Sequence, residues 1–369
     1  MAKTTARKWV KAFFMLLSFI VVFLFLITCL TPWLNPSVFW WIGFCGIIAP
    51  HLLVLLLFSF LFWLIVKPKL ALIPLVALCI GYQQISVLFA YNSKDKMNKN
   101  RSLKDLRIVS WNIQSFNGLN ETKTLRKHVK TDIVKSIREY DPDIVCLQEF
   151  NSAVGDANNI GLFKDRYPYY FFSKDYTRKN NYYSGCIVFS KLPIIDSGKI
   201  KYPIAESLIY VDVKKGNDTI RVFTTHLQSF KFKKADYEDI EKIKQQDEDV
   251  FPASKNIVQK MKIAFQRRGK QALIVKKEID KSPFPSVICG DFNDVPNSYT
   301  YFHIRSNNRS DAFLKKGFGI GRTFLALALT LRIDYILPDK DFAVNKFDLV
   351  DEGLSDHSML VADLSLHKL

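Results

Sequence analysis

The N-terminal part of the chain lacks acidic residues and limits the fold more than any other feature. The first acidic residue is Asp95, and three apolar stretches precede it, at 9–30, 39–66 and 70–91. The first two are as long as the ~20 residues that a transmembrane helix needs, whereas the third is weaker because it carries a proline, a glycine and two glutamines. We therefore expect an all-α membrane region over residues 1–91 with about three transmembrane helices. Buried core helices are the alternative.

The orientation of this region follows from its basic residues. The first stretch is too long and apolar for a signal peptide and no small-residue cleavage site follows it, so we expect a retained anchor. Basic residues at 3–11 and at Lys67 and Lys69 keep the N-terminus and the second loop in the cytoplasm. Three crossings then give a multi-pass protein of the cell (inner) membrane with an extracytoplasmic domain. The basic segment 94–107 favours a cytoplasmic domain instead. The domain would stay inside the cell if the third stretch failed to cross the membrane.

A polar segment separates the membrane region from the rest of the chain. We expect residues 92–105 to form a polar tether and residues 106–369 a catalytic domain. The net charge is +17, of which the membrane region supplies six basic residues and no acid, so the remainder still carries +11. A basic domain suits an anionic substrate, an anionic lipid surface or nucleic acid, and charge alone does not choose among them.

Within this domain, residues 290–294 (GDFND) follow the apolar run 287–289. A β-branched run that stops at Gly-Asp-x-Asn is typical of a buried strand that brings a carboxylate and an amide to the edge of a sheet. An ordinary turn is the alternative, because these residues are common in turns. Further apolar runs carry polar groups of the same kinds, namely Asn112, Glu149, His226, Asp334, Asp356 and His357.

The order of these motifs resembles the endonuclease/exonuclease/phosphatase superfamily, the fold of pancreatic-type deoxyribonuclease, neutral sphingomyelinases and inositol-phosphate 5-phosphatases, here as a membrane-anchored bacterial member. The resemblance runs from residue 106 to the C-terminus. It implies an α/β fold, a four-layer α/β sandwich in which two packed mixed β-sheets are flanked by helices. It also implies hydrolysis of a phosphoester by an activated water and a divalent metal, usually Mg²⁺, with Mn²⁺ as the alternative ion.

The resemblance assigns the metal to three residues. Glu149 is the first choice as ligand, and Asn112 and Asp356 complete the set. Magnesium prefers oxygen ligands and keeps several waters, so one or two carboxylates with an amide suffice. Phosphoester hydrolysis needs such a cation because negative charge accumulates on the phosphoryl and leaving oxygens.

The resemblance assigns five further residues to the reaction. Asp291 corresponds to the carboxylate that positions the water, and His357 to a general base or phosphate-contacting imidazole held by Asp334. The role of base stays shared between Asp291 and His357. His226 and Asn293 would donate hydrogen bonds to the phosphoryl oxygens, although His226 also fits a core histidine.

The substrate is predicted from the combination of membrane spans with this fold. It is similar to neutral sphingomyelinases with N-terminal hydrophobic segments, and to three-span bacterial glycopeptide-resistance proteins thought to act on undecaprenyl pyrophosphate. Anchoring beside a bilayer raises the effective concentration of a lipid, so a lipid-linked phosphate, phosphodiester or pyrophosphate is the leading prediction. A membrane-tethered endo- or exonuclease acting on nucleic acid is the alternative, and a catalytically inactive binding module a third. The bilayer is an expected partner, and no protein partner is inferable.

An unusually apolar segment, residues 325–329 (LALAL), precedes the Asp334 strand. It fits either an apolar lip that meets lipid or a buried strand, and the buried strand is the preferred interpretation.

Overall fold

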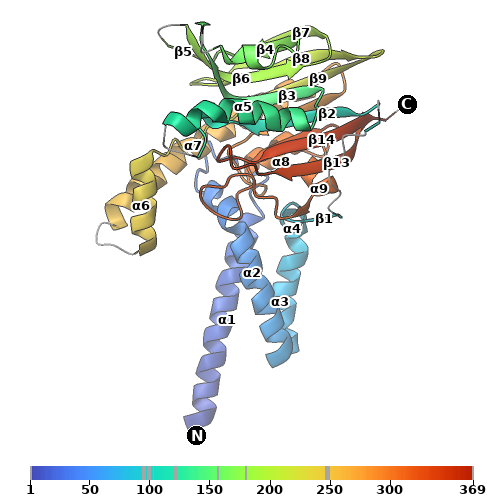
Figure 1. Ribbon diagram of the computed structural model, residues 1–369. Helices are drawn as coiled ribbons and strands as arrows, with labels where there is room; N and C mark the ends of the chain where they lie inside the picture. The colour runs from blue at the N-terminus through green and yellow to red at the C-terminus, as the bar shows by residue number, and fades with distance from the viewer. Residues whose placement is uncertain are drawn as a thin grey trace.

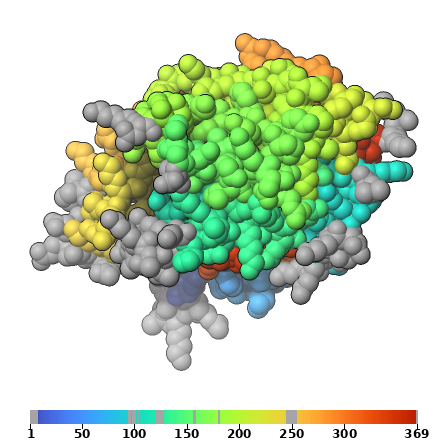
Figure 2. Space-filling model, turned by 45° about the horizontal axis from the view of Figure 1, so that its top comes forward, coloured from blue at the N-terminus to red at the C-terminus, as the bar shows by residue number. Residues whose placement is uncertain are grey.

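The structure is a computed structural model that describes residues 2–93, 97, 101–102, 104–119, 123–155, 158–178, 181–245 and 250–367. Two β-sheets pack face to face with helices outside them, and a group of N-terminal helices projects from one side (Figure 1). On the opposite side the surface is formed by strands from the middle of the chain, coloured green and yellow-green, with the blue N-terminal helices beneath (Figure 2).

The first sheet has seven strands in the order β13-β14-β2-β3-β6-β4, with β5 paired to β6. Its centre is the parallel pair β2 and β3, and β2 is buried along its whole length. That burial explains why β2 is an almost continuous apolar run. The strands are β2 (Leu106–Asn112), β3 (Ile144–Ser152), β4 (Tyr169–Phe172), β5 (Tyr176–Arg178), β6 (Tyr182–Ser190), β13 (Phe342–Val350) and β14 (Met359–Leu366).

The second sheet has five strands in the order β12-β10-β9-β8-β7. Strands β9 and β10 are parallel, and β12 runs antiparallel to β10. Both sheets are therefore mixed. The strands are β7 (Ile194–Lys201), β8 (Ser207–Lys215), β9 (Asp218–His226), β10 (Ser286–Asp291) and β12 (Asp334–Pro338).

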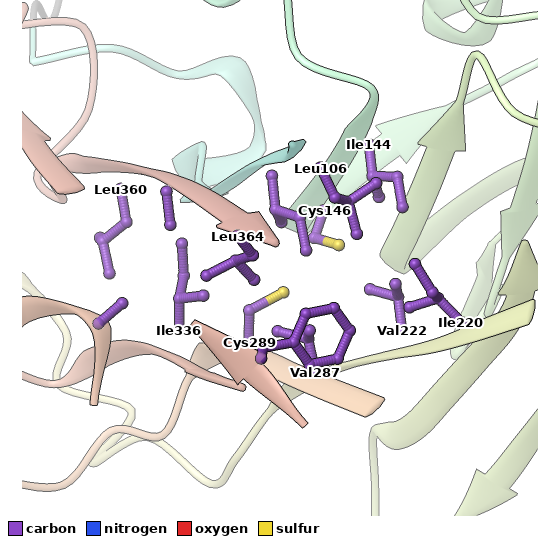
Figure 3. Packing of buried hydrophobic residues seen from close by; sticks show 14 of the residues in the cluster. Leu106, Ile144, Cys146, Ile220, Val222, Val287, Cys289, Ile336, Leu360 and Leu364 are labelled. Carbon is purple, nitrogen blue, oxygen red and sulfur yellow. The ribbon is translucent and has the colours of Figure 1, made fainter. Parts of the chain in front are cut away.

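The main core lies between the two sheets. Leu106 and Ile144 come from the seven-stranded sheet and meet Val222, Val287 and Ile336 from the other, as Figure 3 shows. These side chains are fully buried or nearly so. This central contact fixes the two sheets relative to each other.

Helices cover the outer face of each sheet. On the seven-stranded sheet lies α5 (Lys123–Glu139), which buries Ile133 and Ile137. On the five-stranded sheet lie α7 (Val250–Asp280) and α8 (Tyr299–Arg305), with Val275 and Ile288 in one cluster. The predicted four-layer α/β sandwich is confirmed. Shorter elements complete it, namely η1 (Gln114–Phe116), η3 (Asn159–Leu162), α6 (Lys234–Gln245) and α9 (Ala312–Lys316).

The N-terminal helices are α1 (Ala2–Thr28), α2 (Ile42–Val66), α3 (Pro68–Ile80) and α4 (Tyr82–Ser86). Within the described residues, two segments are long and apolar enough to cross a membrane, Lys8–Thr28 and Ile42–Val66, and 17% and 22% of their most apolar windows are buried. Core helices of a soluble protein would be mostly buried. The third apolar stretch forms α3 and α4, which are separated at Gly81, and its end forms β1 (Ala90–Tyr91), so a third crossing stays a prediction.

The N-terminal segment contacts the catalytic domain directly. Strand β1 pairs with β11 (Phe318–Gly319), and Asn92 Nδ2 donates to the carbonyls of Leu314 and Gly317. The ring of Phe44 on α2 lies 5.1 Å from that of Phe265 on α7. Residues 94–96, 98–100 and 103 of the predicted tether lie outside the described residues, so the tether stays a prediction.

Candidate active site

The polar ends of the central strands meet at one edge of the two sheets. In the five-stranded sheet, Asp291 lies opposite His226 on β9 and Asp334 on β12. In the seven-stranded sheet, Asn112 ends β2, and the pairing of β3 shifts register where Glu149 stands with a φ of 52°. A bulge of this kind re-aims a side chain. Here the bulge lies at Glu149, whose side chain lines the same cavity as Asp291.

Strands β9 and β10 of the five-stranded sheet approach each other closely just before Asp291. Gly290 has a φ of 135°, and a Cβ there would lie 2.1 Å from the carbonyl oxygen of Thr225, so only glycine fits. Asn112, from the other sheet, donates from Nδ2 to Asp291 Oδ2 at 3.0 Å and to Glu149 Oε1 of its own sheet at 3.3 Å. Asn112 therefore links carboxylates from both sheets.

A buried histidine lies between two carboxylates. His357 Nδ1 is 2.9 Å from Asp334 Oδ2, and its Nε2 is 3.8 Å from Asp291 Oδ2. Burial alone lowers the pKa of His357, but the charges of Asp334 and Asp291 outweigh it and raise this pKa to about 10. Burial, together with the charge of Asp334, raises the pKa of Asp291 to about 6. At neutral pH a protonated His357 therefore faces an ionised Asp291.

A second histidine faces the same carboxylate. His226 Nε2 lies 3.5 Å from Asp291 Oδ2, and its Nδ1 lies 3.8 Å from Glu206 Oε1. Burial lowers the pKa of His226, but Glu206, Asp291 and Glu149 outweigh it and raise this pKa. Burial also raises the pKa of Glu206. The sequence analysis missed Glu206, a single acidic residue just before β8 that no pattern marks.

The residues predicted to hold metal lie beside this group. Glu149 and Asp356 line one cavity with Gln114, whose Nε2 donates to Asp356 Oδ2 at 3.2 Å. Burial raises the pKa of Asp356, and the charge of Glu149 adds to the effect. Gln114 Oε1 is buried and has no hydrogen-bond partner among the described residues. Two like charges beside an unpaired amide oxygen suit a hard divalent cation.

A second group of candidate ligands overlaps the histidine. One ligand atom from each of Asp291, Asp334 and His357 lies within 4.8 Å of the others. The hydrogen bond between His357 and Asp334 already occupies one atom of each. A cation held by all three at those atoms would compete with that bond.

The cavity at this edge has a volume of about 310 Å³. Its lining contains six of the eight predicted site residues: Glu149, His226, Asp291, Asn293, Asp356 and His357. The other two contact members of this set, since Asn112 donates to Asp291 and Asp334 is hydrogen-bonded to His357. The structure thus brings all eight together. Asn293 differs in detail, because its Nδ2 donates to the carbonyl of Leu227 at 3.0 Å.

The apolar part of the cavity lining includes a residue of α2. The apolar lining side chains are Ile47, Phe230, Phe232, Val295, Phe324, Leu327, Leu331 and Ile333. Lys231 is the single lysine or arginine among the described residues that line the cavity. The preferred interpretation of residues 325–329 is wrong, since this segment is a loop in which Leu329 is 72% exposed.

The model of the Endonuclease/Exonuclease/phosphatase family matches residues 109–357, a range that includes every predicted site residue. The chain belongs to this family. Its members are metal-dependent hydrolases of phosphoester bonds, so the predicted class of enzyme is confirmed. A second family model, a domain of unknown function (DUF8431), matches residues 11–88. No curated protein matches the chain.

Solved structures of this family share the fold at low identity. The endonuclease/exonuclease/phosphatase from Beutenbergia cavernae DSM 12333 is 23% identical, with a TM-score of 0.52 over 71% of this chain and 72% of that one. The human Nocturnin catalytic domain with bound sulfate anion is 20% identical, with a TM-score of 0.51 over 72% of this chain and 94% of that one. A family protein from Bacteroides vulgatus is 19% identical, with a TM-score of 0.50 over 71% and 99%.

Proposed function

We propose that the chain is a membrane-anchored phosphoesterase that depends on a divalent metal and acts on a lipid-linked phosphate, phosphodiester or pyrophosphate. The composition of the cavity carries this proposal, because its lining combines carboxylates and imidazoles with many apolar side chains. A nucleic-acid backbone is usually bound by several lysines and arginines. A largely apolar lining with one lysine is better suited to the first carbons of a lipid beside its phosphate.

We assign the metal to Glu149 and Asp356, with the amide oxygens of Gln114 and Asn112 nearby. These are the oxygen donors that Mg²⁺ and Mn²⁺ prefer. The ion would neutralise charge on the non-bridging and leaving oxygens. The alternative group with Asp334 and His357 is less suitable, because those two side chains are already hydrogen-bonded to each other.

The protein's own groups then divide the work. Since Nδ1 of His357 is held by Asp334, its Nε2 faces Asp291 and the cavity. The protonated imidazole donates to a phosphoryl oxygen, and Asp291 accepts the proton of the attacking water. The role of general base, which the sequence left shared between Asp291 and His357, is thus assigned to Asp291. A histidine with a raised pKa is a poor base at neutral pH. His226 supplies a second donor, and Asn293 positions the loop through Leu227.

We further propose three membrane crossings. Helices α3 and α4 together run from Pro68 to Ser86, which is about 28 Å at 1.5 Å per residue and close to the hydrocarbon thickness of a bilayer. The N-terminus and the α2–α3 turn lie at the end of the helices remote from the catalytic domain (Figure 1). The basic residues at that end favour the cytoplasm, so the domain would be extracytoplasmic.

The test is hydrolysis by full-length protein in detergent with Mg²⁺, offered plasmid DNA, RNA, undecaprenyl pyrophosphate and sphingomyelin in parallel. We expect phosphate or headgroup release from a lipid, loss of release with EDTA, and recovery with Mg²⁺ or Mn²⁺. His357→Ala serves as the blank. Turnover confined to DNA or RNA would contradict the lipid substrate, and activity that EDTA leaves intact would contradict the metal.

A further inference from the structure

Helix α2 is a candidate membrane span, and it also lines the active-site cavity. Ile47 lines the same cavity as Asp291 and His357. One residue earlier, a Cβ on Gly46 would lie 2.7 Å from the carbonyl oxygen of Asn297. The helix backbone therefore lies directly against the segment that follows the catalytic strand β10, and glycine is what allows this approach.

The face of α2 that begins at Ile47 is not covered by the other N-terminal helices. Residues 47, 51, 54, 58, 61 and 65 follow the spacing of one helix face. Along it Val54 is 51% exposed, Phe58 66% and Ile65 84%. The opposite face packs into the bundle, where Leu56 is fully buried beside Phe25 of α1 and Ala77 of α3. An uncovered apolar stripe therefore runs from the cavity to the far end of α2.

A loop of the catalytic domain lines the cavity together with α2. The backbones of Phe324 and His357 form an isolated antiparallel β-bridge, and the centres of their rings lie 5.0 Å apart. Leu327 and Leu331 line the cavity from the same loop, while Leu329 is exposed. The amide of Leu325 donates to the carbonyl of Asp356 at 2.8 Å, which ties this loop to a proposed metal ligand.

We propose that the hydrocarbon end of the substrate leaves the cavity between Ile47 and the 324–331 loop and continues into the bilayer along the exposed stripe of α2. This inference rests on the proposed function. The enzyme would then cut the headgroup of a lipid whose chain stays in the membrane, without extracting the lipid. Helix α2 would be one wall of the substrate site, and the occupant a phosphate ester of a long-chain membrane lipid.

A polar residue on the stripe supports this route. His51 lies one turn beyond Ile47 on the same face and is exposed. A titratable side chain within a membrane span is uncommon and typically serves substrate or water. Here it would mark the level at which the polar headgroup gives way to the hydrocarbon chain.

The route is tested by photo-crosslinking to full-length protein in phosphatidylcholine nanodiscs. The probe is dodecyl phosphate with a diazirine early in its alkyl chain, and the labelled peptides are mapped by mass spectrometry. We expect crosslinks on α2 near Ile47 and on the 324–331 loop that unlabelled dodecyl phosphate displaces and dodecanol does not. Ile47→Trp, which fills the exit, should lower their yield about tenfold.

Two further variants make the result specific. Ile80→Trp is the matched control, because Ile80 is 58% exposed on α3 and does not line the cavity; it should leave the yield unchanged. Ile47→Ala should keep the crosslinks and shows that position 47 tolerates change. Crosslinks spread over α1 and α3, or unaffected by Ile47→Trp, would overturn the route.

A second assay distinguishes failure of the lipid route from failure of the proposed phosphoesterase reaction. Hydrolysis of the water-soluble ester bis-p-nitrophenyl phosphate reports the catalytic centre without a long chain. Hydrolysis without specific crosslinks would refute the lipid route and leave the phosphoesterase standing. Specific crosslinks without hydrolysis of any phosphoester would retain the lipid site and refute the proposed reaction.

Discussion

At the scale of single residues, the Asp334–His357 pair gives the sharpest expectation. Replacing Asp334 by asparagine keeps the size of the side chain but removes the charge that most raises the pKa of His357. The protonated imidazole would then be lost at lower pH, so the alkaline limb of the kcat profile should move toward neutrality. We expect kcat at neutral pH to fall about a hundredfold, measured as a pH–rate profile with Asp218→Asn, an exposed site, as the control.

An unchanged alkaline limb in Asp334→Asn would show that His357 owes its proton to other groups. A rise in KM with constant kcat would also contradict the assignment, because the proposed hydrogen bond to the phosphoryl oxygen strengthens in the transition state.

The proposed metal ligands predict an effect that does not depend on turnover. Glu149 and Asp356 are two carboxylates in one cavity, and a bound cation stabilises the folded state by mass action. Mg²⁺ at a hundred times its dissociation constant should stabilise the wild type by about 2.7 kcal/mol. The shift of the thermal midpoint with Mg²⁺ should be much smaller in Glu149→Gln, whereas Asp218→Asn should keep it. An equal shift in Glu149→Gln would place the ion elsewhere.

At the scale of elements, a buried ion pair lies just before the catalytic strand β12, and its arginine also bonds the segment that follows the N-terminal helices. Arg332 and Asp311 are each 1% exposed in their side chains and lie 2.7 Å apart, and Arg332 also donates to the carbonyl of Val87. Removing one partner of a buried pair leaves an uncompensated charge. Arg332→Met should therefore lower the free energy of unfolding by about 3 kcal/mol or more, measured by denaturant unfolding of the detergent-purified protein.

The control for this prediction is an exposed ion pair. Lys281 and Glu278 are 57% and 26% exposed, so Lys281→Met should cost less than about 1 kcal/mol. Equal effects of the two substitutions would show that the Arg332 pair adds nothing beyond a surface contact.

The sequence alone predicted those strands that are buried over a continuous run of residues. The strands before Asn112, Glu149 and Asp291 lie between a second sheet and a layer of helices, so their apolar runs are unambiguous. The polar residue at each strand end then marked the site. Glu206 was missed because only tertiary contacts bury it. Residues 325–329 were misjudged because an apolar loop beside a cavity has the same composition as a buried strand.

At the scale of the whole molecule, the proposed three crossings can be tested by labelling cysteines in intact cells. Asn217 lies in the exposed turn between β8 and β9, and Lys69 is exposed at the far end of the helices. If α3 and α4 complete the third crossing, a membrane-impermeant maleimide should label Asn217→Cys in intact cells. It should label Lys69→Cys only after permeabilisation.

The control is the unmodified chain, whose six cysteines include four that are buried, so its labelling sets the background. Labelling of Asn217→Cys only after permeabilisation would mean that the interrupted helix at Gly81 turns back, leaving the catalytic domain in the cytoplasm. The same cavity would then still open beside α2, because Ile47 and Gly46 contact the site wherever the domain lies. Topology would thus decide which leaflet supplies the proposed lipid substrate, whereas the position of α2 beside the cavity favours a lipid substrate in either topology.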